Sequence, residues 1–110
     1  MNADLKIAAD LRKAADYLRT HGWVQFDLGR DGGPRCLLGA FDSICAGREW
    51  PAMCALFPLA GGSIVNWNNA PGRTLAEVLD RLESTALGLE IRALSETLEV
   101  AVPLAEVAVA

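Results

Sequence analysis

Residues 36–46 read CLLGAFDSICA, and apolar side chains lie on almost every side of the helix that this segment predicts. Such a helix suits the middle of a domain, and Gly47 is expected to end it. The preceding residues 29–35 are rich in glycine and arginine and predict a flexible loop. This loop delivers Cys36 to the first turn of the helix, beside Arg35.

Further structure is predicted before this central segment. Between Ala3 and His21, apolar residues recur at three- and four-residue steps and form the single stripe of an amphipathic helix. Asn2 can cap the start of this helix, and Gly22 can adopt the left-handed conformation after its end. Residues 23–28 alternate between apolar and polar side chains, which predicts a short extended segment.

Three helical segments are predicted after it. A short helix begins near Trp50 and runs to about residue 57, and a helical turn covers residues 63–68. Thr74 and Glu77 form a capping box that opens a longer helix, in which Glu77 and Arg81 have the spacing of a favourable ion pair.

The whole chain is expected to form one domain. It has 110 residues, of which 52% are hydrophobic, and we expect a mainly all-α bundle of about four to five helices with a glycine-rich loop. The last helix is expected to reach about Glu99, although residues 98–102 also alternate as a strand would. Residues 88–110 form an apolar C-terminal extension that must cover either its own core or a second copy of the chain. We therefore expect a homodimer.

Charge and composition bear on partners and location. The net charge is −4, and residues 47–110 carry eight acidic side chains against four arginines, a poor match for a phosphate backbone. We therefore expect no binding to nucleic acid. No apolar run has the length of a membrane-spanning helix, and the N-terminal residues lack the features of a secretory signal. Three cysteines fit a reducing compartment, so we expect a cytoplasmic protein without membrane association.

Cys36 is the candidate for covalent chemistry. A helix N-terminus and the neighbouring Arg35 favour negative charge on its sulfur, and His21, the only histidine, is the candidate base. Cys36 and His21 are thus the candidate catalytic residues of a thiol-dependent enzyme or thiol sensor. Alternatively, Cys36 is a small buried hydrophobe, as cysteine often is. Because Cys36, Cys45 and Cys54 are nine residues apart, they match no common metal motif, and we expect no metal or other cofactor.

A second candidate site consists of five residues. Arg35 and Arg73 precede two predicted helix starts, where anions bind readily. Trp67, Asn68 and Asn69 would add a flat apolar wall and directional hydrogen bonds. Together these residues predict a pocket for a small anionic ligand or a peptide. Alternatively, the asparagines form turns and caps, Trp67 fills the core and Arg73 pairs with an acid.

Four segments also carry a family resemblance. Gly22-Trp23, RCLLGA at residues 35–40, WNNAPGRT at residues 67–74 and EVL at residues 77–79 resemble a family of small hypothetical proteins from actinobacteria and their phages. The resemblance covers residues from about 8 to 86. That family more often has aspartate at the position of Asn69. The resemblance therefore implies no role for a carboxylate at this position of the chain. Because the family has no established activity, the resemblance implies only a setting on a mobile or accessory genome.

These observations favour one function over two others. We predict a small helical accessory protein that acts by binding another protein and is not an enzyme. Thiol chemistry at Cys36 and the binding of a small anionic ligand near Arg35, Trp67 and Arg73 are the alternatives.

Overall fold

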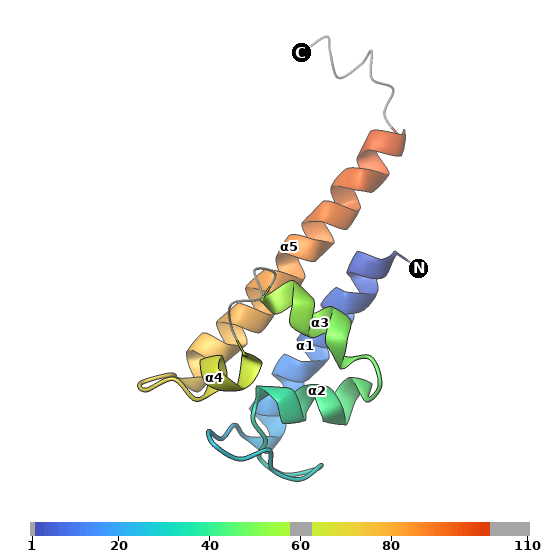
Figure 1. Cartoon of the computed structure of the whole chain (residues 1–110). Coiled ribbons are helices and arrows are strands. Elements are labelled where there is room, and N and C mark those ends of the chain that lie inside the picture. Colours follow the sequence, from blue (N-terminus) through green and yellow to red (C-terminus); the bar gives the residue numbers. More distant parts are fainter. Residues whose placement is uncertain (1, 58–62, 102–110) are drawn as a thin grey trace.

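The computed structural model describes residues 2–57 and 63–101. Within these residues the chain forms five helices, which confirms the all-α fold: α1 (Ala3–His21), α2 (Leu37–Cys45), α3 (Glu49–Leu56), α4 (Ile64–Asn68) and α5 (Leu75–Ala101) (Figure 1). No described helix is long and apolar enough to cross a membrane.

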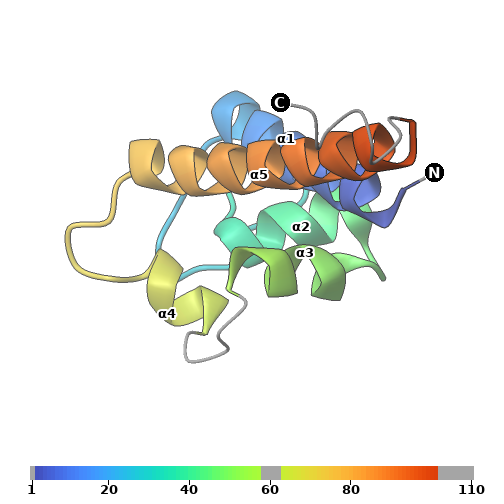
Figure 2. The same cartoon turned by 90° about the horizontal axis from the view of Figure 1, so that it is seen from above.

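The helices form two layers. α1 and α5 lie side by side and antiparallel, α2 and α3 pack beneath them, and α4 lies at one end of the bundle (Figure 2). As expected of a central helix, α2 contacts α1, α3 and α4. The core lies between the two layers and contains fully buried side chains from both, among them Leu11, Leu18, Leu37, Phe41, Leu56, Val78 and Leu82.

Ion pairs hold α1 against α5 along its solvent edge. Asp4 accepts two hydrogen bonds from Arg92, at 2.6 and 2.7 Å, and Glu90 accepts two from Arg12, at 2.8 and 2.6 Å. These bonds lower the pKa of both carboxyl groups below their usual range. The pairs join the first turn and the middle of α1 to the second half of α5, in keeping with the antiparallel arrangement of the two helices.

Two of the expected helix starts are confirmed by hydrogen bonds. The side chain of Asn2 accepts from the N–H of Asp4 at 2.7 Å. In the capping box, the hydroxyl oxygen of Thr74 accepts from the N–H of Glu77, and the Glu77 carboxylate accepts from the N–H of Thr74. In both cases the capping side chain lies within three residues of the N–H group that it accepts from, so neighbouring residues determine where the helix begins.

Two local expectations are wrong in detail. Gly22 follows the end of α1 with the expected positive φ, 101°, but its ψ of 160° differs from that of a left-handed helix. Glu77 pairs with Arg73 at 3.0 Å instead of with Arg81. The Arg81 guanidinium instead donates to the carbonyl of Leu56 at 2.5 Å, because α3 ends close to this side of α5.

The segment at residues 23–28 is not a regular strand. Isolated bridges connect Trp23 and Gly29 to Arg35, but Phe26 between them has a φ of 63°. A left-handed backbone is unfavourable for an aromatic residue and interrupts an extended run. The extended segment expected from the alternating pattern is therefore present only as isolated bridges at its ends.

Candidate functional site

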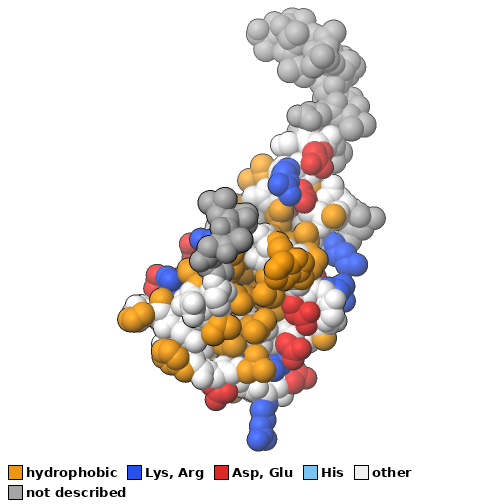
Figure 3. All heavy atoms as spheres, in the orientation of Figure 1, with side chains coloured by type: hydrophobic (Ala, Val, Ile, Leu, Met, Phe, Trp, Pro, Cys, Tyr) orange, Lys and Arg blue, Asp and Glu red, His pale blue; other side chains and the backbone are white. Residues whose placement is uncertain are grey.

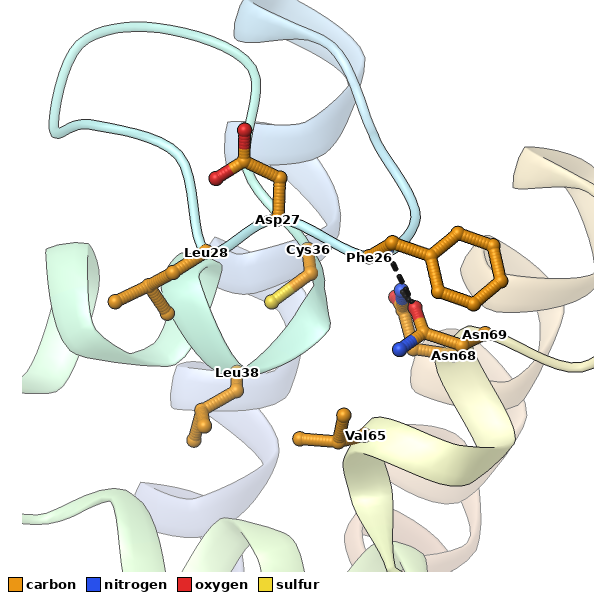
Figure 4. Close-up of a pocket in the computed structure, with 8 residues that line it drawn as sticks. All are labelled: Phe26, Asp27, Leu28, Cys36, Leu38, Val65, Asn68 and Asn69. Atoms are coloured by element: carbon orange, nitrogen blue, oxygen red, sulfur yellow. Dashed lines mark hydrogen bonds between the residues drawn. The ribbon is translucent and has the colours of Figure 1, made fainter.

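A hollow of about 420 Å³ lies where the loop before α2, the start of α2 and the end of α4 meet. We call it the Cys36 hollow, and it is lined by Phe26, Asp27, Leu28, Cys36, Leu38, Val65, Asn68 and Asn69. In Figure 4 the sulfur of Cys36 and the side chains of Leu38 and Val65 face a common space, whereas the Asp27 carboxylate points away from it. The walls are thus mainly apolar, with a thiol at the start of a helix among them.

Cys36 is the N-cap of α2. Its sulfur accepts a hydrogen bond from the N–H of Gly39 at 3.5 Å, and the residue is buried. His21 is not part of the lining; its ring instead lies 4.4 Å from that of Tyr17, between centroids. Of the two candidate catalytic residues, the structure therefore brings only Cys36 to the hollow.

Arg35 is buried, and its guanidinium is engaged in hydrogen bonds within the protein. Its guanidinium donates to the carbonyl of Leu28 at 3.2 Å, to the hydroxyl of Ser43 at 2.7 Å and to the carboxylate of Asp42 at 3.3 Å. A Cβ at Gly39 would lie 2.5 Å from the oxygen of Leu28 and 2.8 Å from the Arg35 Nε atom. The pattern Arg-Cys-Leu-Leu-Gly thus has a local explanation, since the loop and the arginine pack directly on the first turn of α2.

Asn68 is a buried polar hub, only 1% exposed. Its side-chain oxygen accepts from the indole N–H of Trp23 at 2.6 Å and from the N–H of Leu37 at 3.0 Å. Its amide nitrogen donates to the carbonyl of Val24 at 3.1 Å and to the side-chain oxygen of Asn69 at 3.0 Å. One side chain therefore joins α4, the start of α2 and the segment after α1, and all its hydrogen-bonding capacity is used.

Asn69 holds the rim of the hollow. Its side-chain oxygen accepts from the N–H of Phe26 at 2.8 Å, the bond drawn in Figure 4. Gln25 adds bonds from its amide nitrogen to the carbonyls of Asn68 and Ala70, at 3.1 and 3.0 Å. These bonds hold Phe26 in its left-handed backbone conformation, and the residue is 78% exposed.

Trp67 and Arg73 form a separate stack outside the lining. The Arg73 guanidinium lies 4.1 Å from the centre of the Trp67 ring and donates to the Trp67 carbonyl at 3.0 Å. Arg73 also pairs with Glu77, and Trp67 packs against Phe57. Of the five residues expected at a ligand pocket, the structure places Asn68 and Asn69 at the hollow and engages Arg35, Trp67 and Arg73 elsewhere.

The other two cysteines differ in exposure. Cys45 is buried in the core, where desolvation raises the pKa of its thiol to about 11, and Cys54 is exposed. All three cysteines are unpaired. At neutral pH the thiol of Cys45 is therefore protonated and has no access to reagents.

Sequence reasoning did not select Phe26, Leu28, Leu38 and Val65 as lining residues. The alternation over residues 24–28 put Phe26 and Leu28 on one side of the segment, which was the available signal. Tyr17 was also overlooked, and nothing local marks its role. Its hydroxyl donates to the carbonyl of Gly33 at 2.7 Å and accepts from the N–H of Gly32 at 3.0 Å, which orders the glycine loop.

Comparisons with known proteins bear on the family alone. No curated protein and no solved structure matches the chain. A family model does match, over residues 2–87, and this span includes every residue that lines the Cys36 hollow. The chain therefore belongs to DUF6197, a family of unknown function.

Proposed function

We propose that the protein is a protein–protein interaction module that accepts an apolar side chain of its partner in the Cys36 hollow. The observation that carries the proposal is the exposure of large apolar side chains, Phe26, Leu28 and Val65, around one concave site. On the face shown in Figure 3, hydrophobic side chains gather over the middle of the molecule, where α3 and α4 lie in Figure 1.

The polar groups beside the hollow support binding over catalysis. The amide of Asn68 is saturated by bonds to the protein, and the guanidinium of Arg35 donates three bonds to it. Among the described residues, every buried side-chain nitrogen or oxygen has a hydrogen-bond partner. A catalytic site needs groups that are free to bind a reacting substrate, whereas an apolar docking site needs only its surroundings to be rigid.

The negative charge at the rim of the hollow and on the chain as a whole favours a partner segment that carries positive charge. Asp27 is the charged member of the lining, and its carboxylate points out of the hollow at the rim. The chain as a whole has a net charge of −4. We therefore commit to a partner segment in which a large apolar residue is flanked by lysine or arginine, because such a segment fills the hollow and places a cation at the rim.

The experiment is a selection of displayed random peptides on the full chain. We expect enriched peptides with an apolar–basic pair whose affinity falls at least about tenfold on a Val65→Asp variant. Leu5→Asp is the matched control, since it adds the same charge at an apolar position of the same exposure, 40%, on another helix. Circular dichroism checks that both variants fold. Peptides that bind Val65→Asp as tightly as the wild type, or no enrichment at all, would refute the proposal.

A thiol function at Cys36 is the second candidate, supported by the sulfur that faces the hollow from the start of α2. A helix N-terminus stabilises a thiolate. The test is the alkylation rate of each cysteine against pH, with Cys45 and Cys54 as internal references. Fast reaction of Cys36 with a midpoint below that of an ordinary thiol would support this candidate, and inertness until unfolding would remove it.

We also propose a cytoplasmic location and an accessory role on a mobile genome. Three unpaired cysteines support the first point, since thiols stay reduced in that compartment. The second rests on the family resemblance of the sequence. Fractionation of a cell that expresses the chain with its natural neighbours tests the location.

A further inference from the structure

The second half of α5 has two apolar faces, and only one of them packs on the protein. Ala86 is buried against the core, together with Val78 and Leu82 earlier in the helix. On another face, Leu87, Ile91 and Leu94 are 51%, 55% and 60% exposed. Their spacing of four and three residues is that of a coiled-coil seam. We call these three residues the α5 seam.

Small, uncharged residues border the α5 seam. Ser84, Gly88 and Ser95 lie beside it and are exposed. A Cβ at Gly88 would meet nothing within 4 Å, so packing within the chain does not require glycine there. Glycine in a helix interior nevertheless destabilises it relative to alanine. Close approach of another helix is a physical reason for a glycine at this position.

Charge favours a second copy of this chain at the seam. The acidic side chains nearest to it along the helix, Glu83 and Glu90, are paired with Arg19 and Arg12 of α1. Two copies with a net charge of −4 repel each other, and repulsion is weakest where the facing surfaces are uncharged. The seam itself contains no charged residue and these two acidic neighbours are already paired, so it is a part of α5 that a like-charged copy can approach.

We propose that α5 pairs with α5 of a second copy, antiparallel, about a two-fold axis at Ile91. Residues at equal distances before and after Ile91 then face each other across the axis. Leu94 meets Gly88 of the partner subunit, and Leu87 meets Ser95 of the partner subunit. Each leucine of the seam thus faces a small residue, and the two Ile91 side chains meet each other at the axis, a pattern that lets two helices interdigitate.

This interface is independent of the Cys36 hollow, and most of it lies beyond the family match, which ends at residue 87. It is therefore a property of this chain's C-terminal part. Three large side chains per copy give a small interface, so we expect a dissociation constant on the order of 10–100 µM.

Sedimentation equilibrium of the full chain tests the pairing, at concentrations from about 5 to 500 µM. The wild type is expected to rise from 11.7 kDa toward twice that mass. An Ile91→Glu variant should remain monomeric because it places two carboxylates at the axis. Ala76→Glu is the matched control, since it adds the same charge at an exposed position on α5 away from the seam. A monomeric wild type, or an Ile91→Glu protein that dimerises equally well, would overturn the proposal.

Gly88→Leu tests the register. In the monomer the added side chain meets open space and leucine is the better helix former, so the melting temperature should be unchanged or higher. In the dimer it collides with Leu94 of the partner subunit, so association should weaken at least about tenfold. Adding Leu94→Ala restores a large–small pair and should restore association. Undiminished association of Gly88→Leu, or no rescue by the double variant, would refute an axis at Ile91.

Discussion

Replacing Asn68 with alanine should remove a large part of the protein's stability. The change leaves two N–H donors, of Trp23 and Leu37, without the oxygen that now accepts from both. A buried polar group left unsatisfied costs about 1–3 kcal/mol, so the two donors together cost about 2–6 kcal/mol. The carbonyl of Val24 and the side chain of Asn69 also lose a donor. Against a typical total of about 5–15 kcal/mol, this loss is severe.

Urea denaturation followed by far-UV circular dichroism and by tryptophan fluorescence measures the loss. Asn66→Ala is the matched control, because Asn66 lies in the same helix and is exposed, and it bonds Ser63 through its backbone N–H. We expect the control to change the free energy of unfolding by no more than about 0.5 kcal/mol. A loss below about 1 kcal/mol for Asn68→Ala would show that water replaces the amide and that Asn68 does not hold the three segments together.

Three further predictions concern packing, pH and thiol access. Gly39→Ala should destabilise the fold by about 1–3 kcal/mol, since the added Cβ would lie 2.5 Å from a backbone oxygen. A thermal or urea melt measures this loss, and an unchanged melt would contradict the close packing. The pKa values of Asp4 and Glu90 are lowered by Arg92 and Arg12, so their stabilisation is complete above the ordinary values of 3.8 and 4.5 and is lost as pH falls through the lower folded values. Urea unfolding at different pH values should therefore show that stability falls below about pH 5, and that it falls less steeply for Glu90→Gln than for the wild type. If the stability curves of the two proteins are parallel, the ion pair of Arg12 and Glu90 does not stabilise the fold. On the native protein at about pH 8, a maleimide should modify the exposed Cys54 first. Cys45 is buried and its pKa is raised to about 11, so it should react only on unfolding. Early modification of Cys45 would show that the core opens readily.

The helices could be predicted from the sequence because their signals are local. The apolar stripe between Ala3 and His21 and the capping box of Thr74 and Glu77 each lie within a few turns of one helix. Neighbouring residues alone therefore determine where these helices begin. Local spacing does not predict every ion pair, however. Glu77 pairs with Arg73 and not with Arg81, because Arg81 donates to a carbonyl at the end of α3.

The candidate site could be predicted only in part. Cys36, Asn68 and Asn69 were selected from the sequence and do line one hollow. Arg35 and Arg73 were selected as charged residues before helix starts, but both find partners inside the protein. Whether an arginine is free for a ligand depends on which carbonyls and acids lie near it in the fold, and sequence spacing does not contain that information.

The sequence by itself determined an all-α domain, its helix starts and its membership of a family, because periodicity, capping and motif are properties of neighbouring residues. The tertiary structure alone decided that Asn68 bonds residues 31 and 45 positions away, that Phe26 is held exposed at a rim, and that α5 keeps a second apolar face in solvent. The physical reason is that burial and hydrogen-bond saturation are set by which distant segments meet.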